Sequence, residues 1–399
     1  MTRKRMNARG WLVLGALSAY AAIPGWSQPG TVLRTATLYQ EPGVYCAWPS
    51  IARMANGDLL VAFTATEEHL APDGRILIIR STDDGRTWTG PDTLLDTPID
   101  ERESGFTAGA DGGLVAHLWS TRHTPEFYRG LPPGAYRKDV LDRWIARVES
   151  VSYRACTTLH GAWQRTSTDN GRSWSVPVRS RDAVHGGIRL PNGTLLIASY
   201  RDDQPMIGIH AAGAGDTGYV RIATVRSPQP DSIAFGEPHL ALLPTGRIIM
   251  MIRATALPYN DRDPRCVLWE TYSDDGGVTW VRPFATRLWG FPPHLLVLED
   301  GRVVCSYGYR RMPFGERACV STDGVTWDPA NETVLSDGAP NGDLGYPASV
   351  QLRDGSILTV YYQPPVGAGT VQEMHPPDPD RTKPAITGTV WRPAPPDRR

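Results

Sequence analysis

The sequence predicts an all-β fold, a six-bladed β-propeller, from two repeated motifs and from the scarcity of long helical patterns. A short glycine turn followed by aliphatic residues occurs six times, with its glycines at Gly57, Gly112, Gly193, Gly246, Gly301 and Gly355. Asn-Gly and Asp-Gly between aliphatic runs indicate hairpins, because type I′ turns need positive φ. Successive glycines are 55, 81, 53, 55 and 54 residues apart. This period suits one four-stranded blade for each repeat.

A second motif, Ser-x-Asp-x-Gly-x-x-Trp, supports the same fold. It occurs at 81–88, 167–174 and 273–280, and in a form shortened by one residue at 321–327. The short Ser and Asp side chains can cap backbone donors in a turn, and the tryptophan can fill the space between strands. We expect these Asp-boxes to be structural and not catalytic.

The 81-residue interval exceeds a normal repeat by roughly 27 residues, which places an insertion near 121–150. Apolar residues at helical spacing predict a short amphipathic helix in it: Val140, Leu141, Trp144, Ile145 and Val148. The insertion is either a lid over the mouth of the ring or a packed decoration of its rim.

The N-terminus has the pattern of a cleavable export signal. Basic residues between Arg3 and Arg9 precede a short apolar stretch at 12–22 and then small residues. We therefore expect a signal peptide at 1–27, a propeller at 31–392 and a flexible tail at 393–399. The protein is expected to be secreted or periplasmic and free of the membrane after cleavage; a membrane-anchored form is the alternative.

The charge and the cysteine content restrict the classes of partner and of metal site that the protein is expected to have. The 41 basic and 42 acidic residues give a net charge of −1, so no basic surface predicts nucleic acid binding. The five cysteines include no C-x-x-C pair, and we expect most of them to be buried free thiols. A disulfide between Cys305 and Cys319 is the alternative for those two residues. No spacing of ligand residues indicates a metal, and no cofactor is expected.

Four Asp-boxes on six hairpin repeats resemble the sialidase (neuraminidase) superfamily, over about residues 40–392. The resemblance implies an exo-acting glycosidase that cleaves a terminal acidic sugar, sialic acid or a related ulosonic or uronic acid, from an oligosaccharide or glycoconjugate. In that family three arginines hold the carboxylate of the sugar. A tyrosine assisted by a glutamate attacks the anomeric carbon, and an aspartate is the acid and base.

Part of that catalytic pattern can be placed on this sequence. The segment at 345–349 is similar to the nucleophile segment and implies Tyr346 as the nucleophile, while Glu237 matches the assisting glutamate. Arg253 matches the second arginine, and Arg310 or Arg311 the third. The chemistry is consistent, because a phenol with a pKa near 10 is a weak nucleophile until a carboxylate accepts its proton.

Other positions depart from the family. Ala47, beside Trp48, stands where the first arginine is expected, and Arg102 could compensate for it. The acid/base is expected in the loop 67–75, where Glu68 and Asp73 are both candidates.

Further candidates for substrate binding are His69 and Arg75 in that loop, and His185. Because a histidine near the mouth could itself be the catalyst, two other functions stay open. One is a histidine-driven polysaccharide lyase or rhamnosidase-type enzyme, and the other is a non-catalytic carbohydrate-binding propeller.

Overall fold

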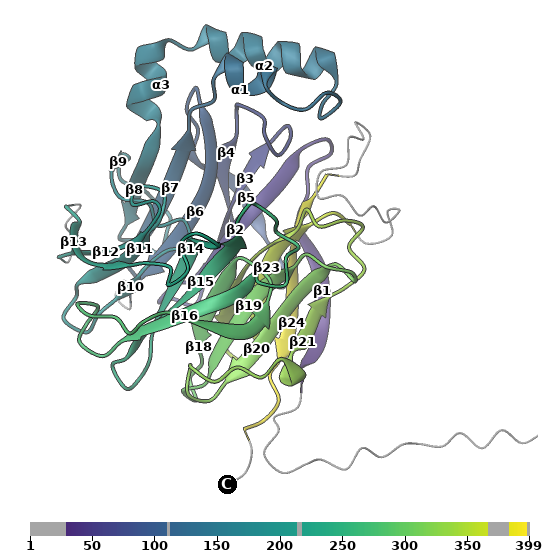
Figure 1. Ribbon diagram of the computed structural model, residues 1–399. Helices are drawn as coiled ribbons and strands as arrows, with labels where there is room; N and C mark the ends of the chain where they lie inside the picture. The colour runs from purple at the N-terminus through teal and green to yellow at the C-terminus, as the bar shows by residue number, and fades with distance from the viewer. Residues whose placement is uncertain (1–28, 110–111, 214–217, 366–382, 397–399) are drawn as a thin grey trace, which may run out of the picture.

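The computed structural model of the protein describes residues 29–109, 112–213, 218–365 and 383–396 (Figure 1). The predicted signal peptide at 1–27 and the last residues of the predicted tail lie outside these ranges.

Six antiparallel sheets of four strands each surround a common centre, which confirms the six-bladed propeller. Blade 1 contains β2 (Tyr45–Arg53), β3 (Leu59–Thr66), β4 (Arg75–Ser81) and β5 (Thr89–Leu95). Blade 2 contains β6 (Asp100–Ala108), β7 (Leu114–Thr121), β8 (Gly161–Ser167) and β9 (Val178–Arg179). Blade 3 contains β10 (Ile188–Arg189), β11 (Leu195–Ser199), β12 (Ile207–Ala212) and β13 (Val220–Val225).

The second half of the ring has the same organisation. Blade 4 contains β14 (Ile233–Leu242), β15 (Ile248–Ala256), β16 (Val267–Ser273) and β17 (Phe284–Trp289). Blade 5 contains β18 (Pro293–Val297), β19 (Val303–Tyr309), β20 (Gly315–Ser321) and β21 (Thr333–Ser336). Blade 6 contains β22 (Gly345–Gln351), β23 (Ile357–Gln363), β24 (Ala385–Arg392) and β1 (Thr31–Tyr39). Because β1 pairs with β24, the two ends of the chain close the ring together.

The Asp-box turns lie on the face of the ring opposite the start of the inner strands. In each blade the strands alternate in direction, so the turns after the first and third strands share one face. In the first Asp-box, Ser81 Oγ accepts the amide of Gly85 at 2.8 Å, and Asp83 Oδ1 accepts the amides of Arg86 and Thr87 at 3.0 and 2.9 Å. These carboxylates are used by the turns themselves, which agrees with a structural role.

The inserted segment between β7 and β8 stands on the other face, above the loop 67–74 of blade 1 (Figure 1). It holds three helices, α1 (Pro125–Arg129), α2 (Lys138–Ser150) and α3 (Tyr153–Leu159), where the sequence indicated one. The third begins because Ser152 caps it, accepting the amide of Ala155 at 3.2 Å. Trp144 fastens the insertion to the ring through a bond of 2.8 Å from Nε1 to Glu67 Oε2.

Buried ionisable groups within the blades predict that stability declines as the pH rises above neutral. Burial raises the pKa of Glu101 and of Glu270 to about 8, and it lowers the pKa of His117 to about 4 and of His294 to about 3. The folded protein holds the two carboxyls protonated, so stability is lost as the pH rises from 4.5 through 8. It holds the histidines neutral, so stability is lost as the pH falls below 6.5.

Between pH 4.5 and 6.5 these two contributions have opposite slopes, so we expect the free energy of unfolding to change little there and to decline above pH 6.5, as measured by urea titration between pH 4.5 and 9. Above pH 6.5 the histidines are neutral in both the folded and the unfolded state, so the decline of the unfolding free energy with pH is caused by the two carboxyls. Glu270→Gln should therefore weaken the decline above pH 6.5, and below pH 6.5 it should make stability rise with pH, because the histidine contribution is then less opposed. Stability that keeps increasing up to pH 8 would contradict this account.

Candidate functional site

Three inner strands carry the same irregularity where they enter the ring. The pairing register shifts in β2 between Ala47 and Ser50, in β14 between Gly236 and His239, and in β22 between Gly345 and Ala348. Inside these bulges Trp48, Glu237 and Tyr346 adopt φ values of 53°, 42° and 52°, and each precedes a proline. Positive φ is strained for such residues, and a bulge redirects a side chain, so strain is concentrated at the mouth of the ring.

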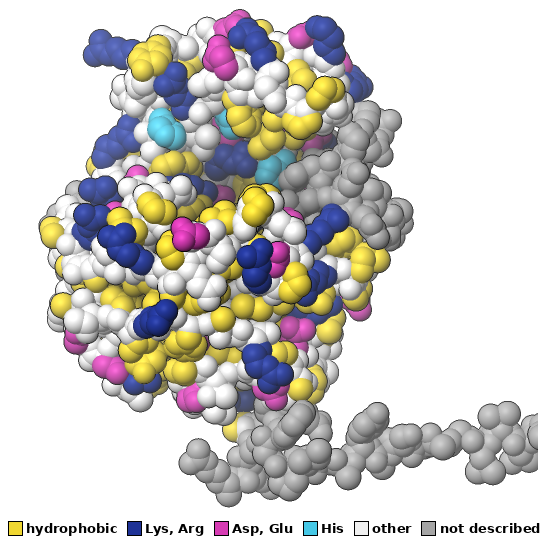
Figure 2. All heavy atoms as spheres, viewed as in Figure 1, with side chains coloured by type: hydrophobic (Ala, Val, Ile, Leu, Met, Phe, Trp, Pro, Cys, Tyr) yellow, Lys and Arg dark blue, Asp and Glu magenta, His cyan; other side chains and the backbone are white. Residues whose placement is uncertain are grey.

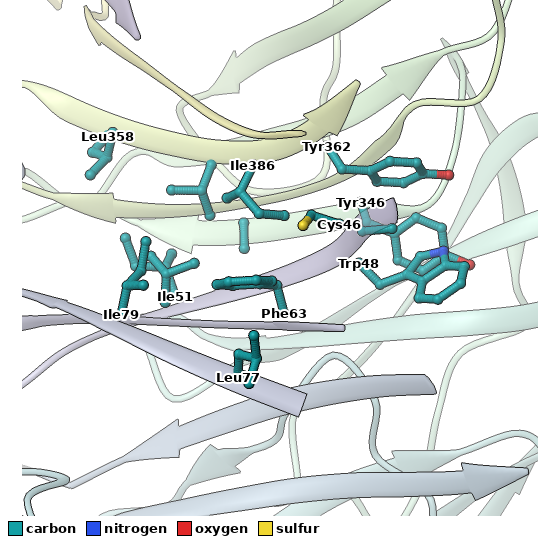
Figure 3. Packing of buried hydrophobic residues seen from close by; sticks show 14 of the residues in the cluster. Cys46, Trp48, Ile51, Phe63, Leu77, Ile79, Tyr346, Leu358, Tyr362 and Ile386 are labelled. Carbon is teal, nitrogen blue, oxygen red and sulfur yellow. The ribbon is translucent and has the colours of Figure 1, made fainter. Parts of the chain in front are cut away.

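Trp48 and Tyr346 therefore lie next to one another, and Tyr362 of β23 lies beside them (Figure 3). Behind these rings the blade interface is filled by aliphatic and aromatic side chains such as Ile51, Phe63 and Ile386. A hydrophobic core thus supports the polar mouth from below.

Tyr346 and Glu237 are hydrogen-bonded, and Arg253 holds the other oxygen of the glutamate. Tyr346 Oη donates to Glu237 Oε1 at 2.8 Å, and Arg253 Nη1 donates to Glu237 Oε2 at 2.7 Å. Burial, and then the charge of Glu237, raises the pKa of Tyr346 well above 10. Burial also acts to raise the pKa of Glu237, but the charges of Arg253 and His185 and the bonds from Arg253 and Tyr346 lower it overall. The pair is therefore a neutral phenol donating to a carboxylate.

The guanidinium groups of Arg253 and Arg310 both lie over the ring of Phe291, at 4.4 and 5.0 Å from its centre. Arg310 is buried, and its Nε donates to the carbonyl of Leu344 at 3.0 Å. Two neighbouring cations repel one another, and an anion between them relieves that repulsion.

Arg311, the other candidate for the third arginine, turns away from Arg310. Its guanidinium stacks on Trp289 at 3.6 Å, and its Nη2 donates to the carbonyl of Arg262 at 3.3 Å. The structure thus brings Arg310 to the Tyr346 cluster and leaves Arg311 at the edge of blade 5.

Arg102 approaches the mouth from blade 2. Its guanidinium lies 4.3 Å above the ring of Trp48, and Nη1 donates to the carbonyl of His69 at 2.7 Å and to Asp100 Oδ2 at 3.2 Å. It is therefore a cation beside the segment that carries Ala47 and Trp48.

The loop 67–75 sends its ionisable side chains in different directions. Glu68 pairs with Lys383, next to the start of β24. Asp73 faces the insertion: partial desolvation, and then the charges of Glu67 and Asp100, raise its pKa, while Arg147 of α2 opposes the shift. Arg75 lies 3.7 Å from a carboxylate oxygen of Glu41 and is 43% exposed, which places it at the rim.

His185 stacks on Tyr346, with ring centres 5.6 Å apart and planes 23° apart. Burial lowers the pKa of His185, against the charges of Glu237 and Glu103. Glu103 accepts a hydrogen bond from Arg201 and is a residue of the mouth that was not among the candidates from the sequence. The spacing of the hairpin glycines could have identified it, because four residues of the mouth each precede such a glycine by nine residues: Trp48, Glu103, Glu237 and Tyr346.

Figure 2 shows a hollow between the helical insertion and the blades below, with basic and histidine side chains at its edges. Within the described ranges, no group of three or more His, Cys, Asp or Glu side chains is arranged to hold a metal ion. The same part of the chain has no helix that is both long and apolar enough to cross a membrane.

Comparisons with known proteins agree with this architecture. The BNR repeat-like domain family matches residues 144–359, more than half of the chain. A protein of unknown function from Dyadobacter fermentans has a similar structure, with a TM-score of 0.70 and 22% identity over 93% of this chain and 100% of that one. No curated protein matches the sequence significantly.

Two sialidases share the fold at lower identity. The NanB sialidase of Streptococcus pneumoniae has a TM-score of 0.60 and 12% identity over 90% of this chain and 70% of that one. The intramolecular trans-sialidase of Ruminococcus gnavus has a TM-score of 0.55 and 11% identity over 88% and 94% of the two chains.

Proposed function

Because this chain belongs to the BNR repeat-like domain family and shares its six-bladed propeller with sialidases, we propose that it is an exo-acting glycoside hydrolase that removes a terminal acidic sugar. The observation that carries the proposal is the hydrogen bond of 2.8 Å from Tyr346 Oη to Glu237 Oε1. A tyrosine that donates to a buried carboxylate, at the mouth of a ring, has a proton acceptor already in place.

In the proposed reaction Tyr346 attacks the anomeric carbon as a neutral phenol and passes its proton to Glu237. Arg253 orients the glutamate and keeps it ionised until that moment. His185, stacked on the phenol ring, holds the ring in its plane. A neutral nucleophile also avoids the repulsion that a carboxylate would exert on an anionic sugar.

The preference for an acidic sugar rests on the arginines. Arg253 and Arg310 both contact the ring of Phe291, and arginine pairs strongly and directionally with carboxylates. Arg102, over Trp48, supplies a third cation beside Ala47, the position where the resemblance to sialidases implies an arginine. We therefore propose sialic acid or a related ulosonic or uronic acid as the sugar, on an oligosaccharide or glycoconjugate reached after export to the periplasm or the cell exterior.

A screen of the purified protein against 4-nitrophenyl glycosides of acidic and neutral sugars tests this function. We expect release of 4-nitrophenol from an acidic glycoside only. An ultraviolet absorbance assay on acidic polysaccharides runs in parallel, since a lyase would form an unsaturated, absorbing product. A lyase product, or sugar binding without turnover, would contradict the proposal.

Removing one arginine should weaken binding of the acidic substrate. We expect Arg310→Met to raise the KM for the acidic glycoside by roughly 10- to 100-fold, the value of a charge-assisted hydrogen bond. Arg311→Met is the matched control, because that neighbour stacks on Trp289 instead. Equal KM values for the two variants would exclude Arg310 from the binding site.

A further inference from the structure

A chain of hydrogen bonds connects a buried carboxylate to a histidine at the mouth. Tyr45 Oη lies 2.7 Å from His69 Nδ1 and 2.6 Å from Asp343 Oδ1, and Tyr362 Oη donates to the same Asp343 oxygen at 3.2 Å. Tyr45 and Asp343 are buried, whereas the His69 side chain is 21% exposed. The chain of bonds therefore leads from the interior of the propeller to a histidine side chain that is exposed to solvent.

The single proton of the Tyr45 hydroxyl fixes the direction of these bonds. Because Tyr45 donates to Asp343, its oxygen accepts from His69, whose Nδ1 must then carry a proton. In the neutral imidazole this leaves Nε2 as the basic atom. The carboxylate also stabilises the charged imidazolium, since Asp343 Oδ1 lies 3.6 Å from His69 Nδ1, as the aspartate of a Ser-His-Asp triad stabilises its histidine.

His69 also lies near the candidate nucleophile, with the ring of Trp48 in contact with both. Its ring meets Trp48 edge-on at 5.1 Å, and Trp48 in turn packs on Tyr346 at 6.4 Å. Arg102 holds the backbone of the histidine through its carbonyl at 2.7 Å. The histidine is thus fixed across Trp48 from Tyr346, whereas its loop neighbours Glu68 and Asp73 face Lys383 and the insertion.

We propose that His69 is the general acid and base of the reaction and that Tyr45 and Asp343 position it; this inference rests on the proposed hydrolase function. In the first half-reaction Tyr346 Oη bonds to the anomeric carbon and its proton moves to Glu237. His69 begins as the imidazolium, and the bond to the leaving oxygen breaks as that oxygen takes its Nε2 proton. In the second half-reaction Nε2 takes a proton from water, and the bond from the anomeric carbon to Tyr346 Oη breaks as the water oxygen bonds to that carbon. Glu237 returns its proton to Tyr346 Oη.

The kinetic test compares two glycosides of the same acidic sugar, one with a 4-nitrophenyl and one with a methyl leaving group. His69→Gln should reduce formation of the glycosyl-enzyme from the methyl glycoside by about 10³-fold, because a poor leaving group needs the acid. The 4-nitrophenyl glycoside, which needs little protonation, should lose less than about tenfold in that step. Azide should restore turnover of the 4-nitrophenyl glycoside, because it needs no general base.

Equal losses on the two glycosides would overturn the proposal. So would a loss that depends on the leaving group in Glu68→Gln or Asp73→Asn but not in His69→Gln. Tyr346→Phe distinguishes this failure from failure of the proposed function, since a hydrolase without Tyr346 chemistry would retain its activity in that variant.

The tautomer of His69 gives a measurement that needs no turnover. In protein labelled with ¹⁵N-histidine, the resonances of His69 are assigned from their loss in His69→Gln. We expect the neutral ring to be protonated at Nδ1, and Tyr45→Phe and Asp343→Asn to shift the population toward the Nε2–H form. Predominant protonation at Nε2 in the unaltered protein would rule out the relay, whatever the substrate.

Discussion

Tyr346→Phe is expected to reduce kcat for an acidic 4-nitrophenyl glycoside by roughly 10³-fold or more, because it removes the oxygen that forms the glycosyl-enzyme. The phenyl ring remains, so its contacts with His185 and Trp48 are kept. Glu237 retains its bond to Arg253, and the loss of the hydroxyl should lower the free energy of unfolding by only about 1–3 kcal/mol. Glu237→Gln should slow the same step.

Tyr307→Phe provides a matched control for this prediction. Tyr307 of β19 is a fully buried phenol that also donates to a glutamate, Glu332, but it belongs to the hydrophobic core that blades 4 and 5 form together. The control should lose stability and keep its turnover. A Tyr346→Phe protein with full activity, together with an inactive His185→Ala protein, would instead move the protein to the histidine-driven class of propeller enzymes.

The ring itself was predictable because its signals are local. Each hairpin glycine, such as Gly57 with φ of 89°, occupies a conformation that other residues avoid, and each Asp-box satisfies its own turn. Such features are encoded within eight residues and repeat at the period of a blade. The insertion was visible for the same reason, as an interruption of that period, but its third helix depends on a single cap at Ser152.

The mouth was predictable only where a residue has a fixed place relative to those turns. Glu237 and Tyr346 precede their glycines by nine residues, so their bulges place both at the same face. The neighbours Arg310 and Arg311 could not be separated, because consecutive side chains leave an extended chain in opposite directions and the register beyond β19 is not local. Tyr45 and Asp343 are 298 residues apart, and only closure of the ring brings them together.

The four Asp-box tryptophans are expected to differ in their contribution to stability, and Trp327→Ala should have the largest effect. Trp327 is only 5% exposed, whereas Trp88, Trp174 and Trp280 are half-buried. Replacing a buried tryptophan by alanine typically costs about 3–5 kcal/mol, since the surrounding core closes the space only partly. Trp327 Nε1 also donates to Glu270 Oε2 at 2.7 Å, so the substitution removes a donor from a buried carboxyl as well.

Urea unfolding of Trp327→Ala and Trp88→Ala, with kcat measured on the folded fraction of each, decides whether this motif is structural. We expect the loss of unfolding free energy to be clearly larger for Trp327, with kcat unchanged in both variants. Trp327→Phe should lie between alanine and the unaltered protein, because the phenyl ring refills part of the space but cannot donate to Glu270. A variant of normal stability that has lost its turnover would show that an Asp-box takes part in the reaction, although these turns and the mouth occupy opposite faces of the ring.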